Sequence, residues 1–365
     1  MPTWRERIIG WHERVALREE PGAGNAAARA GLGAAAAVFG AATGLRDVLY
    51  RTGLLPVARA EVPVISVGNL TLGGTGKTPL VEWLAARCLR AGRRTAVLSR
   101  GYGAVDDEVL DDDPELAAVV RLTGPSRARL AAEAVRDYGA RVLILDDGFQ
   151  HRRLHRDLDI VCVDALRPFG NGRRIPRGIL REPPSALRRA GVVVLTRVDQ
   201  SGPEALNALR ATLRGRLADG VPVVETVHRP VALLPPAGEA ARDPSWLRGR
   251  EVFAFCGIGN PAGFRRTLES LGAGIVRFRT FPDHHPYTPA DMDRLRAESR
   301  EYLAEAMVTT EKDRRRIGAA ADDPLLFALR VRLEPVRHGE ELAKRVDALL
   351  EPAPAPAARP EGVPR

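Results

Sequence analysis

The sequence has few cysteines and few aromatic residues, and these shortages argue against several classes of protein. Cys88, Cys162 and Cys256 are its three cysteines, and no Cys-x-x-Cys pair occurs. Neither a disulfide framework nor a thiolate zinc site is therefore indicated, and a reducing compartment fits best. Aromatic residues make up 5% of the chain, too few to interleave with the arginine runs as single-stranded nucleic-acid sites require. No nucleic-acid partner is expected.

No secretory signal is expected from the first twenty residues, and the uncharged part of the apolar run that follows them is short. The first twenty residues mix arginines with glutamates, unlike a signal peptide. The most apolar run, residues 27–50, has no charge between Arg29 and Arg46, a gap shorter than the ~20 residues of a typical membrane span.

Within this run, small and apolar side chains recur at helical spacing and share one face. They are Ala35, Val38, Ala42, Leu45 and Leu49. Two interpretations stay open. One is a helix that packs on the protein's own body, and the other is an amphipathic helix lying in a membrane surface.

The composition is that of a globular protein with a basic surface. Of the 365 residues, 45% are hydrophobic and 28% charged, and the formal net charge is +9. A chain of this length is expected to form two domains. An excess of positive charge favours anionic partners, among them phospholipid and phosphorylated substrates.

Short β-rich runs alternate with helix-length segments from Val62 onward, which is typical of a parallel sheet with helices on both faces. The runs are residues 62–67, 94–99, 141–146, 159–164 and 191–196, and then 252–257, 274–281, 306–311 and 326–333. A proline-rich stretch, residues 228–240, separates the two series. The sequence therefore predicts an α/β fold with a domain boundary in this stretch.

A glycine-rich segment after the first run resembles a phosphate-binding loop (P-loop). Residues 71–78, TLGGTGKT, match G-x-x-x-x-G-K-[ST] except at the first place. In such a loop Lys77 reaches the β- and γ-phosphates, and the Thr78 hydroxyl binds Mg²⁺. The expected nucleotide-binding residues are Thr71, Gly73, Gly74, Thr75, Gly76, Lys77 and Thr78.

Two acidic residues end a nearby strand and are candidates for organising Mg²⁺. Asp146 and Asp147 follow the four apolar residues 142–145, where a P-loop protein needs an acidic partner. A guanine-specific Asn-Lys-x-Asp is not found at residues 196–199, which read TRVD. We therefore expect ATP as the nucleotide.

The motifs in their order resemble those of the tetraacyldisaccharide 4'-kinase (lipid A 4'-kinase) family over about residues 60–345. They are GNLTLGGTGKTP (68–79), LSRGYG (98–103), LDDGFQHRRLHRDLDIV (145–161), FGNGRRIPRGILREP (169–183), FCGIGNPAGF (255–264), FPDHHPYTPAD (281–291) and VTTEKD (308–313). The resemblance implies an ATP-dependent kinase that phosphorylates the 4'-hydroxyl of an acylated glucosamine disaccharide. It also implies work at the cytoplasmic face of the inner membrane, as a peripheral or monotopic protein.

The resemblance assigns roles to individual residues. The family's Gly-Asp-Glu-Pro stretch corresponds to residues 111–114, DDDP, so Asp112 matches the catalytic aspartate although its neighbours differ. His284 matches the histidine paired with it. Arg181 matches a catalytic position near the nucleotide, and Glu182 matches one near the metal. The expected catalytic set is Asp112, His284, Lys77 and Arg181. The expected metal set is Thr78, Asp146, Asp147 and Glu182.

The expected segments follow from these assignments. Residues 1–60 are the membrane-associating helical segment, 61–232 the P-loop kinase domain, 233–350 a smaller α/β domain, and 351–365 a disordered tail. Residues 309–313 are expected to face the cleft from the second domain, and residues 257–263 to form a strand-to-helix turn.

Two rival functions stay open at this point. One is a regulatory or metal-delivering P-loop NTPase, with His151, His155, His284 and His285 as ligands. The other is a nucleic-acid-binding ATPase, suggested by the basic charge. The cofactors expected for the kinase are ATP and Mg²⁺.

Overall fold

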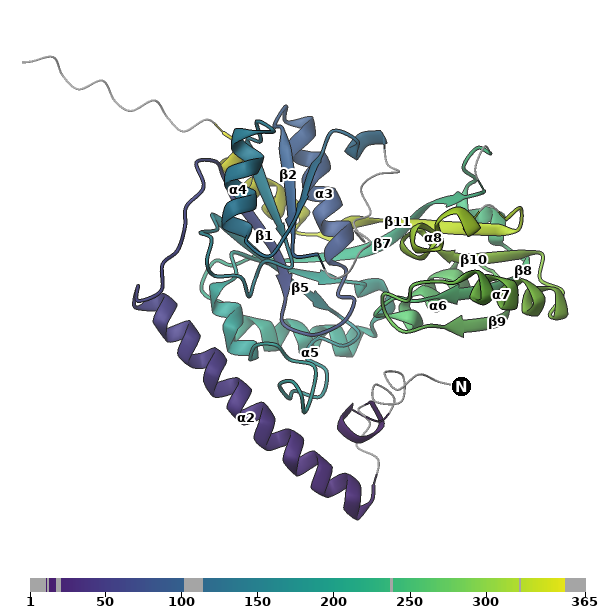
Figure 1. Ribbon diagram of the computed structural model, residues 1–365, viewed down its shortest axis with the longest axis horizontal. Coiled ribbons are helices and arrows are strands. Elements are labelled where there is room, and N and C mark those ends of the chain that lie inside the picture. Colours follow the sequence, from purple (N-terminus) through teal and green to yellow (C-terminus); the bar gives the residue numbers. More distant parts are fainter. Residues whose placement is uncertain are drawn as a thin grey trace, which may run out of the picture.

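One sheet of eleven strands runs through the whole protein (Figure 1). The computed structural model describes residues 11, 13–17, 21–101, 114–236, 239–321 and 323–351. The strand order is β3-β2-β4-β1-β5-β6-β7-β11-β10-β8-β9, and every neighbouring pair except β7 with β11 is parallel. The predicted α/β class, with a mostly parallel sheet, is confirmed.

The elements follow the apolar runs of the sequence closely. The strands are β1 (Val64–Asn69), β2 (Thr95–Ser99), β3 (Val120–Thr123), β4 (Val142–Asp146), β5 (Leu158–Asp164), β6 (Val192–Thr196), β7 (Val223–Leu234), β8 (Glu251–Cys256), β9 (Gly274–Thr280), β10 (Ala306–Thr310) and β11 (Leu326–Arg337). The α-helices are α2 (Ala23–Arg51), α3 (Lys77–Arg90), α4 (Arg127–Arg136), α5 (Pro203–Arg214), α6 (Pro261–Ser270), α7 (Pro289–Glu301), α8 (Glu311–Ile317) and α9 (Gly339–Leu350).

Helices cover both faces of the sheet because successive strand residues point to opposite sides. Ile65 and Val67 of β1 pack in one core cluster with α3 and α9, whereas Val64 packs in another with α4. The strands of this region are buried on both faces, as their continuous apolar runs require.

Two long strands connect the two halves of the sheet. β7 and β11 each have 12 residues and pair antiparallel over most of their length. The sequence did not reveal β7, because its charged residues and Pro230 were read as a boundary stretch. The division into domains at residue 232 stays a prediction, although β7 continues through it to Leu234.

Helix α2 lies along the outside of the molecule (Figure 1). Its residues 24–51 form a helix long and apolar enough to cross a membrane, and none of its most apolar window is buried. Val38 is 71% exposed and Leu45 is 62% exposed. The interpretation that this face packs on the protein's own body is therefore wrong.

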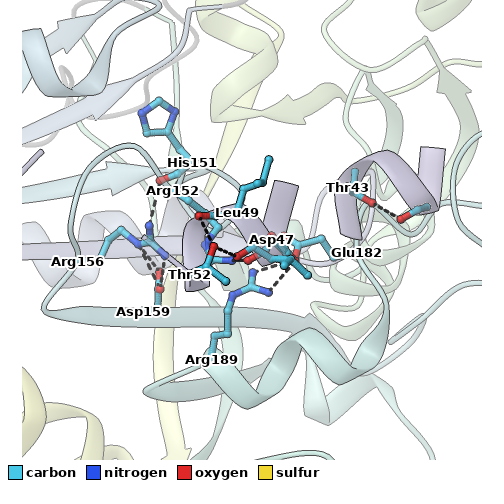
Figure 2. A network of polar contacts seen from close by, with 12 residues as sticks. Thr43, Asp47, Leu49, Thr52, His151, Arg152, Arg156, Asp159, Glu182 and Arg189 are labelled. Atoms are coloured by element: carbon cyan, nitrogen blue, oxygen red, sulfur yellow. Dashed lines mark hydrogen bonds and ion pairs between the residues drawn. The ribbon is translucent and has the colours of Figure 1, made fainter. Parts of the chain in front are cut away.

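A polar network anchors the C-terminal end of α2 (Figure 2). Oδ1 of Asp47 lies 3.1 Å from Nη1 of Arg152, and Oδ2 lies 3.6 Å from Nη1 of Arg189. The Arg152 guanidinium also stacks over the ring of Tyr50, 5.4 Å from its centroid. One carboxylate thus joins the helix to two separate segments of the body.

We expect Asp47→Asn to loosen this anchor without changing its shape, because asparagine is nearly isosteric but uncharged. Two guanidinium groups would then face each other without the carboxylate between them. The free energy of unfolding should fall by about 1 kcal/mol, the scale of partly exposed ion pairs. Urea unfolding and the rate of proteolysis near Leu54 measure the effect. Asp219→Asn on the exposed surface is the matched control, and equal behaviour of the two variants would contradict the anchor.

Candidate active site

A cavity of about 390 Å³ lies at the carboxyl ends of β1 and β4 and is lined from both halves of the sheet. Residues 73–79, Asp146, Asp147 and Arg181 line it from the first half. Residues 258–260, Asp283, His284 and 310–312 line it from the second. Open α/β sheets bind ligands at such carboxyl ends.

The predicted P-loop is a tight turn that leads directly into a helix. Gly73 has φ 103° and Gly76 has φ 83°, conformations that favour glycine. A Cβ atom at Gly76 would also lie 2.8 Å from Nε2 of His228. Helix α3 begins at Lys77, so its free N–H groups and positive dipole end face the cavity, as an anion site requires.

Asn69 shapes this loop, and sequence reasoning did not identify it. Its buried amide donates to the carbonyl of Thr71 at 2.8 Å and to Oγ1 of Thr75 at 2.9 Å. Thr71 is buried and forms a β-bridge with Leu180. Thr71 therefore supports the loop from outside the cavity, whereas residues 73–78 line the cavity. An asparagine directly before a glycine-rich loop was the available signal.

The acidic pair comes next to the P-loop because β1 and β4 are neighbours. Val67 of β1 pairs with Asp146 at the end of β4. Asp147 adopts φ 54° and has its carboxylate between two cations. Its Oδ1 is 3.3 Å from Nζ of Lys77, and its Oδ2 is 2.6 Å from Nη1 of Arg181. Three of the predicted residues thus form one cluster.

The two carboxylates have different charge environments. Burial raises the pKa of Asp146, and Lys77 offsets this only in part. Burial also acts on Asp147, but Lys77 and Arg181 outweigh it and hold its pKa below the usual value. Asp147 therefore stays ionised more readily than its neighbour.

The side chains of Arg181 and Glu182 lie in different surroundings. The backbone N–H of Arg181 donates to the carbonyl of Leu70 at 2.7 Å, which fixes its side chain beside the P-loop. Glu182 is 2% exposed, and its Oε2 accepts from Nη2 of Arg189 at 2.8 Å (Figure 2). Glu182 is not among the residues lining the cavity, so its predicted metal contact stays a prediction.

The second half of the sheet contacts the P-loop directly. A Cβ atom at Gly259 would clash with the backbone N of Gly74. Arg197 donates to the carbonyl of Gly74 at 3.0 Å and to Asp164 at 2.7 Å. Asn260 donates to the same carboxylate of Asp164 at 3.3 Å. The predicted turn between β8 and α6 thus closes over the loop, and Arg197 is a contact that the sequence did not indicate.

His284 reaches the cavity from this second half, together with residues 310–312. Its neighbour His285 turns away, with Nε2 3.1 Å from Asp291 and its ring stacked on Phe281. Asp112, the predicted catalytic aspartate, lies outside the described residues.

The cavity offers oxygen ligands to a divalent cation. Oδ1 of Asp146 is buried and has no hydrogen-bond partner among the described residues. One or two carboxylates with phosphate oxygens suit Mg²⁺, and the Thr78 side chain lines the same cavity. The residues present therefore fit this ion. Among the described residues, no group of three histidine, cysteine, aspartate or glutamate side chains could hold a metal alone.

The histidines of the metal-delivery hypothesis do not gather in one place. His155 lies 3.6 Å from Asp157, while His285 lies beside Asp291. The described residues thus give that hypothesis no common site.

Comparison with known proteins gives a consistent result. The model of the family Tetraacyldisaccharide-1-P 4'-kinase matches residues 28–351. A tetraacyldisaccharide 4'-kinase of Anaeromyxobacter dehalogenans (strain 2CP-C) is 47% identical over 357 residues, covering 92% of this chain and 93% of that protein. One from Syntrophus aciditrophicus is 41% identical, covering 82% and 87% respectively.

A solved structure is similar over nearly the whole chain. It is the "apo" form of LpxK from Aquifex aeolicus in complex with ATP. It has 30% sequence identity and a TM-score of 0.68, and the match covers 88% of this chain and 99% of that one.

Proposed function

The chain belongs to the tetraacyldisaccharide-1-P 4'-kinase family, and from this we propose its reaction. It transfers the γ-phosphoryl group of ATP to the 4'-hydroxyl of an acylated glucosamine disaccharide 1-phosphate, a step of lipid A biosynthesis. The observation that carries the proposal is the cluster of Lys77, Asp147 and Arg181 in a cavity that His284 enters from the opposite half. The regulatory or metal-delivery alternative is not favoured.

The P-loop holds the triphosphate of ATP in this proposal. Backbone N–H groups of Gly73, Gly74 and Gly76 and the N-terminus of α3 bind phosphate oxygens. Lys77 contacts the β- and γ-phosphates. Asp146, Asp147 and the Thr78 hydroxyl would hold Mg²⁺, with Glu182 as a more distant candidate. The ion would neutralise charge on the β- and γ-oxygens.

The transfer itself needs a clamp on the moving group and a base for the acceptor. Arg181 lies near Lys77, because both contact the carboxylate of Asp147. It neutralises charge that develops on the γ-phosphoryl oxygens. Asp112 accepts the proton of the 4'-hydroxyl, and His284 orients it. Closure of the two halves around both substrates excludes water, which would otherwise consume the activated phosphate.

The lipid substrate explains the open face of α2. Val38 and Leu45 enter the acyl region of a membrane surface while the polar side of the helix stays in water. The protein then works as a peripheral or monotopic enzyme. Because ATP is the phosphoryl donor, we place it on the cytoplasmic face of the inner membrane.

Vesicles that contain the acylated disaccharide test the proposal in full-length protein. We expect co-sedimentation with the vesicles and transfer of label from γ-labelled ATP to the lipid. The double variant Val38→Asp, Leu45→Asp should lose most vesicle binding and at least about tenfold in transfer rate, since charges are costly in the acyl region. Leu303→Asp, at a leucine that is 84% exposed elsewhere, is the matched control. Transfer to lipid that is equal in all three proteins would contradict the role of α2, and no transfer in any would contradict the kinase.

A further inference from the structure

The loop that ends at Arg181 lies between the P-loop and the N-terminal part of the chain. We call residues 169–181 the support loop. The Leu72 N–H, in the P-loop, donates to the carbonyl of Ile179 at 2.7 Å. The Arg181 N–H donates to the carbonyl of Leu70, also at 2.7 Å. The place of the Arg181 side chain therefore depends on how the support loop is held.

The support loop is folded closely on itself. The Leu180 N–H donates to the carbonyl of Arg173 at 3.0 Å, and the Ile175 N–H donates to the carbonyl of Leu180 at 2.9 Å. A Cβ atom at Gly178 would clash with the side chain of Asn171 and with the carbonyl of Arg173. A loop closed in this way resists distortion, so a contact at one end affects the other end.

The end of the support loop that is distant from the P-loop binds a segment that precedes the family match. Residues 13–17 form a short helix, whereas the family model begins its match at residue 28. Nδ2 of Asn171 donates to the carbonyl of Ala16 at 3.0 Å, and Nη1 of Arg177 donates to the same carbonyl at 2.6 Å. A carbonyl oxygen has two lone pairs and can accept both hydrogen bonds. We call this pair of hydrogen bonds the Ala16 clamp.

The residues at the Ala16 clamp are buried on the side of the short helix. Val15 is 2% exposed and Ala16 is 0% exposed. Carbonyls in the last turn of a helix need partners outside the helix, and a guanidinium group forms a stronger hydrogen bond than a neutral donor. Loss of these donors would leave a buried carbonyl unsatisfied, which is costly.

Helix α2 contacts both the short helix and the support loop. The segment of residues 13–17 packs on α2. A Cβ atom at Gly40 of α2 would lie 2.5 Å from Nη1 of Arg174 in the support loop. Among the described residues, those that line the cavity do not include 13–17. An effect of this segment on the reaction must therefore pass through the elements that it contacts.

We propose that residues 13–17 are an accessory structural part of the active site, and that Asn171 and Arg177 are positioning residues. The Ala16 clamp holds the support loop, and the loop holds Arg181 where it stabilises the transferred phosphoryl group. The inference rests on the proposed function for the role of Arg181, whereas the clamp is a property of the fold. The N-terminal part of the chain thus contributes to catalysis as well as to attachment at a membrane.

Hydrogen exchange followed by mass spectrometry tests the clamp without any assay of activity. Asn171→Asp is nearly isosteric and keeps the oxygen that accepts from the Arg173 N–H at 3.2 Å, but an ionised carboxylate cannot donate to Ala16. Arg177→Met removes the other donor. In both full-length variants we expect the amides of residues 172–181 to exchange about tenfold faster or more, with no change in α9, because local opening becomes easier. Unchanged exchange in both variants would overturn the proposal.

Phosphoryl transfer from ATP to the acylated disaccharide in vesicles tests the consequence for catalysis. Arg177→Met should lower kcat about tenfold or more, as misplacement of a group that acts in the transition state predicts. KM for ATP should stay within about threefold, because Asn69 of β1 also holds the P-loop. Arg177→Lys should recover most of kcat, since an ammonium group can also donate to the carbonyl. Vesicle binding should not change, which separates this effect from membrane attachment.

Arg136→Met is the matched control for these variants. Arg136 is 71% exposed on α4 and pairs with Asp137, so its replacement should change neither exchange in the support loop nor kcat. Faster exchange with unchanged kcat in both Arg177→Met and Asn171→Asp would overturn the catalytic half of the proposal. If Arg177→Met does not fold, Asn171→Asp decides by the same two measurements. Wild-type protein that transfers no phosphate to lipid would contradict the proposed function, and hydrogen exchange would still decide whether the clamp holds the loop.

Discussion

Lys77→Ala is expected to lower kcat for phosphoryl transfer by about a thousandfold, the scale for removing one strong electrostatic contact from a transition state. Nζ of Lys77 lies 3.3 Å from Asp147, at the start of the helix that faces the cavity. Its removal leaves two neighbouring carboxylates with less positive charge around them. It also removes the cation that reaches the β- and γ-phosphates. The measurement is transfer of label from γ-labelled ATP to the acylated disaccharide at saturating substrates.

Lys344→Ala is the matched control, since it makes the same change at a lysine that is 68% exposed on α9. This control should keep full activity. Lys77→Arg should recover only a small part, because a planar guanidinium group does not replace a compact ammonium group. Activity of Lys77→Ala within tenfold of wild type, with normal ATP binding, would remove the loop from the mechanism.

The first half of the fold was predictable because its strands are buried on both faces. Such strands appear in a sequence as short apolar runs, and residues 62–67, 141–146 and 191–196 all became strands at nearly the predicted places. β3 and β7 were not predicted, because neither appears in the sequence as a continuous apolar run. β3 has four residues, among them Arg121, and β7 carries charged residues and Pro230. The pairing of β7 with β11 depends on residues that lie about a hundred positions apart in the sequence.

The candidate site could also be predicted only in part from the sequence. The P-loop and the pair Asp146 and Asp147 were predicted from short motifs, because strand order alone brings them together. The contact of Arg197 with Gly74 was not predicted, since the two residues are distant in the sequence. Local spacing indicates which elements form, but it contains no information on which loops they will contact.

The second large effect concerns Asp146 and Asp147. Loss of either charge should lower activity, whereas the two changes should have opposite effects on stability. Asp147→Asn and Asp146→Asn should each lower kcat by about a hundredfold or more and raise the Mg²⁺ concentration needed for half-maximal rate, because each removes a carboxylate that would hold the ion. Asparagine tolerates the left-handed conformation of Asp147, so the backbone should remain in place. Activity is measured as a Mg²⁺ titration at fixed ATP.

Stability without ligands should change in opposite directions in these two variants. The pKa of Asp147 lies below its usual value, because Lys77 and Arg181 outweigh burial. Its charge therefore stabilises the fold above the unfolded pKa of about 3.9, and this contribution is lost as the pH falls through the lower folded pKa. Asp147→Asn should lower Tm at neutral pH and have little effect in strong acid.

Asp146 is the reverse case, since burial raises its pKa. Its protonated form favours the fold below the unfolded pKa, and this advantage is lost as the pH rises through the folded pKa. Asp146→Asn should therefore raise Tm at neutral pH although it lowers activity. This trade of stability for function is expected where a buried charge is kept for a ligand. Thermal unfolding of both variants with and without Mg²⁺·ATP measures it. A fall in Tm at neutral pH for Asp146→Asn would mean that Asp146 is stabilised as an ion without the metal, which would contradict its assignment as a ligand kept at a cost.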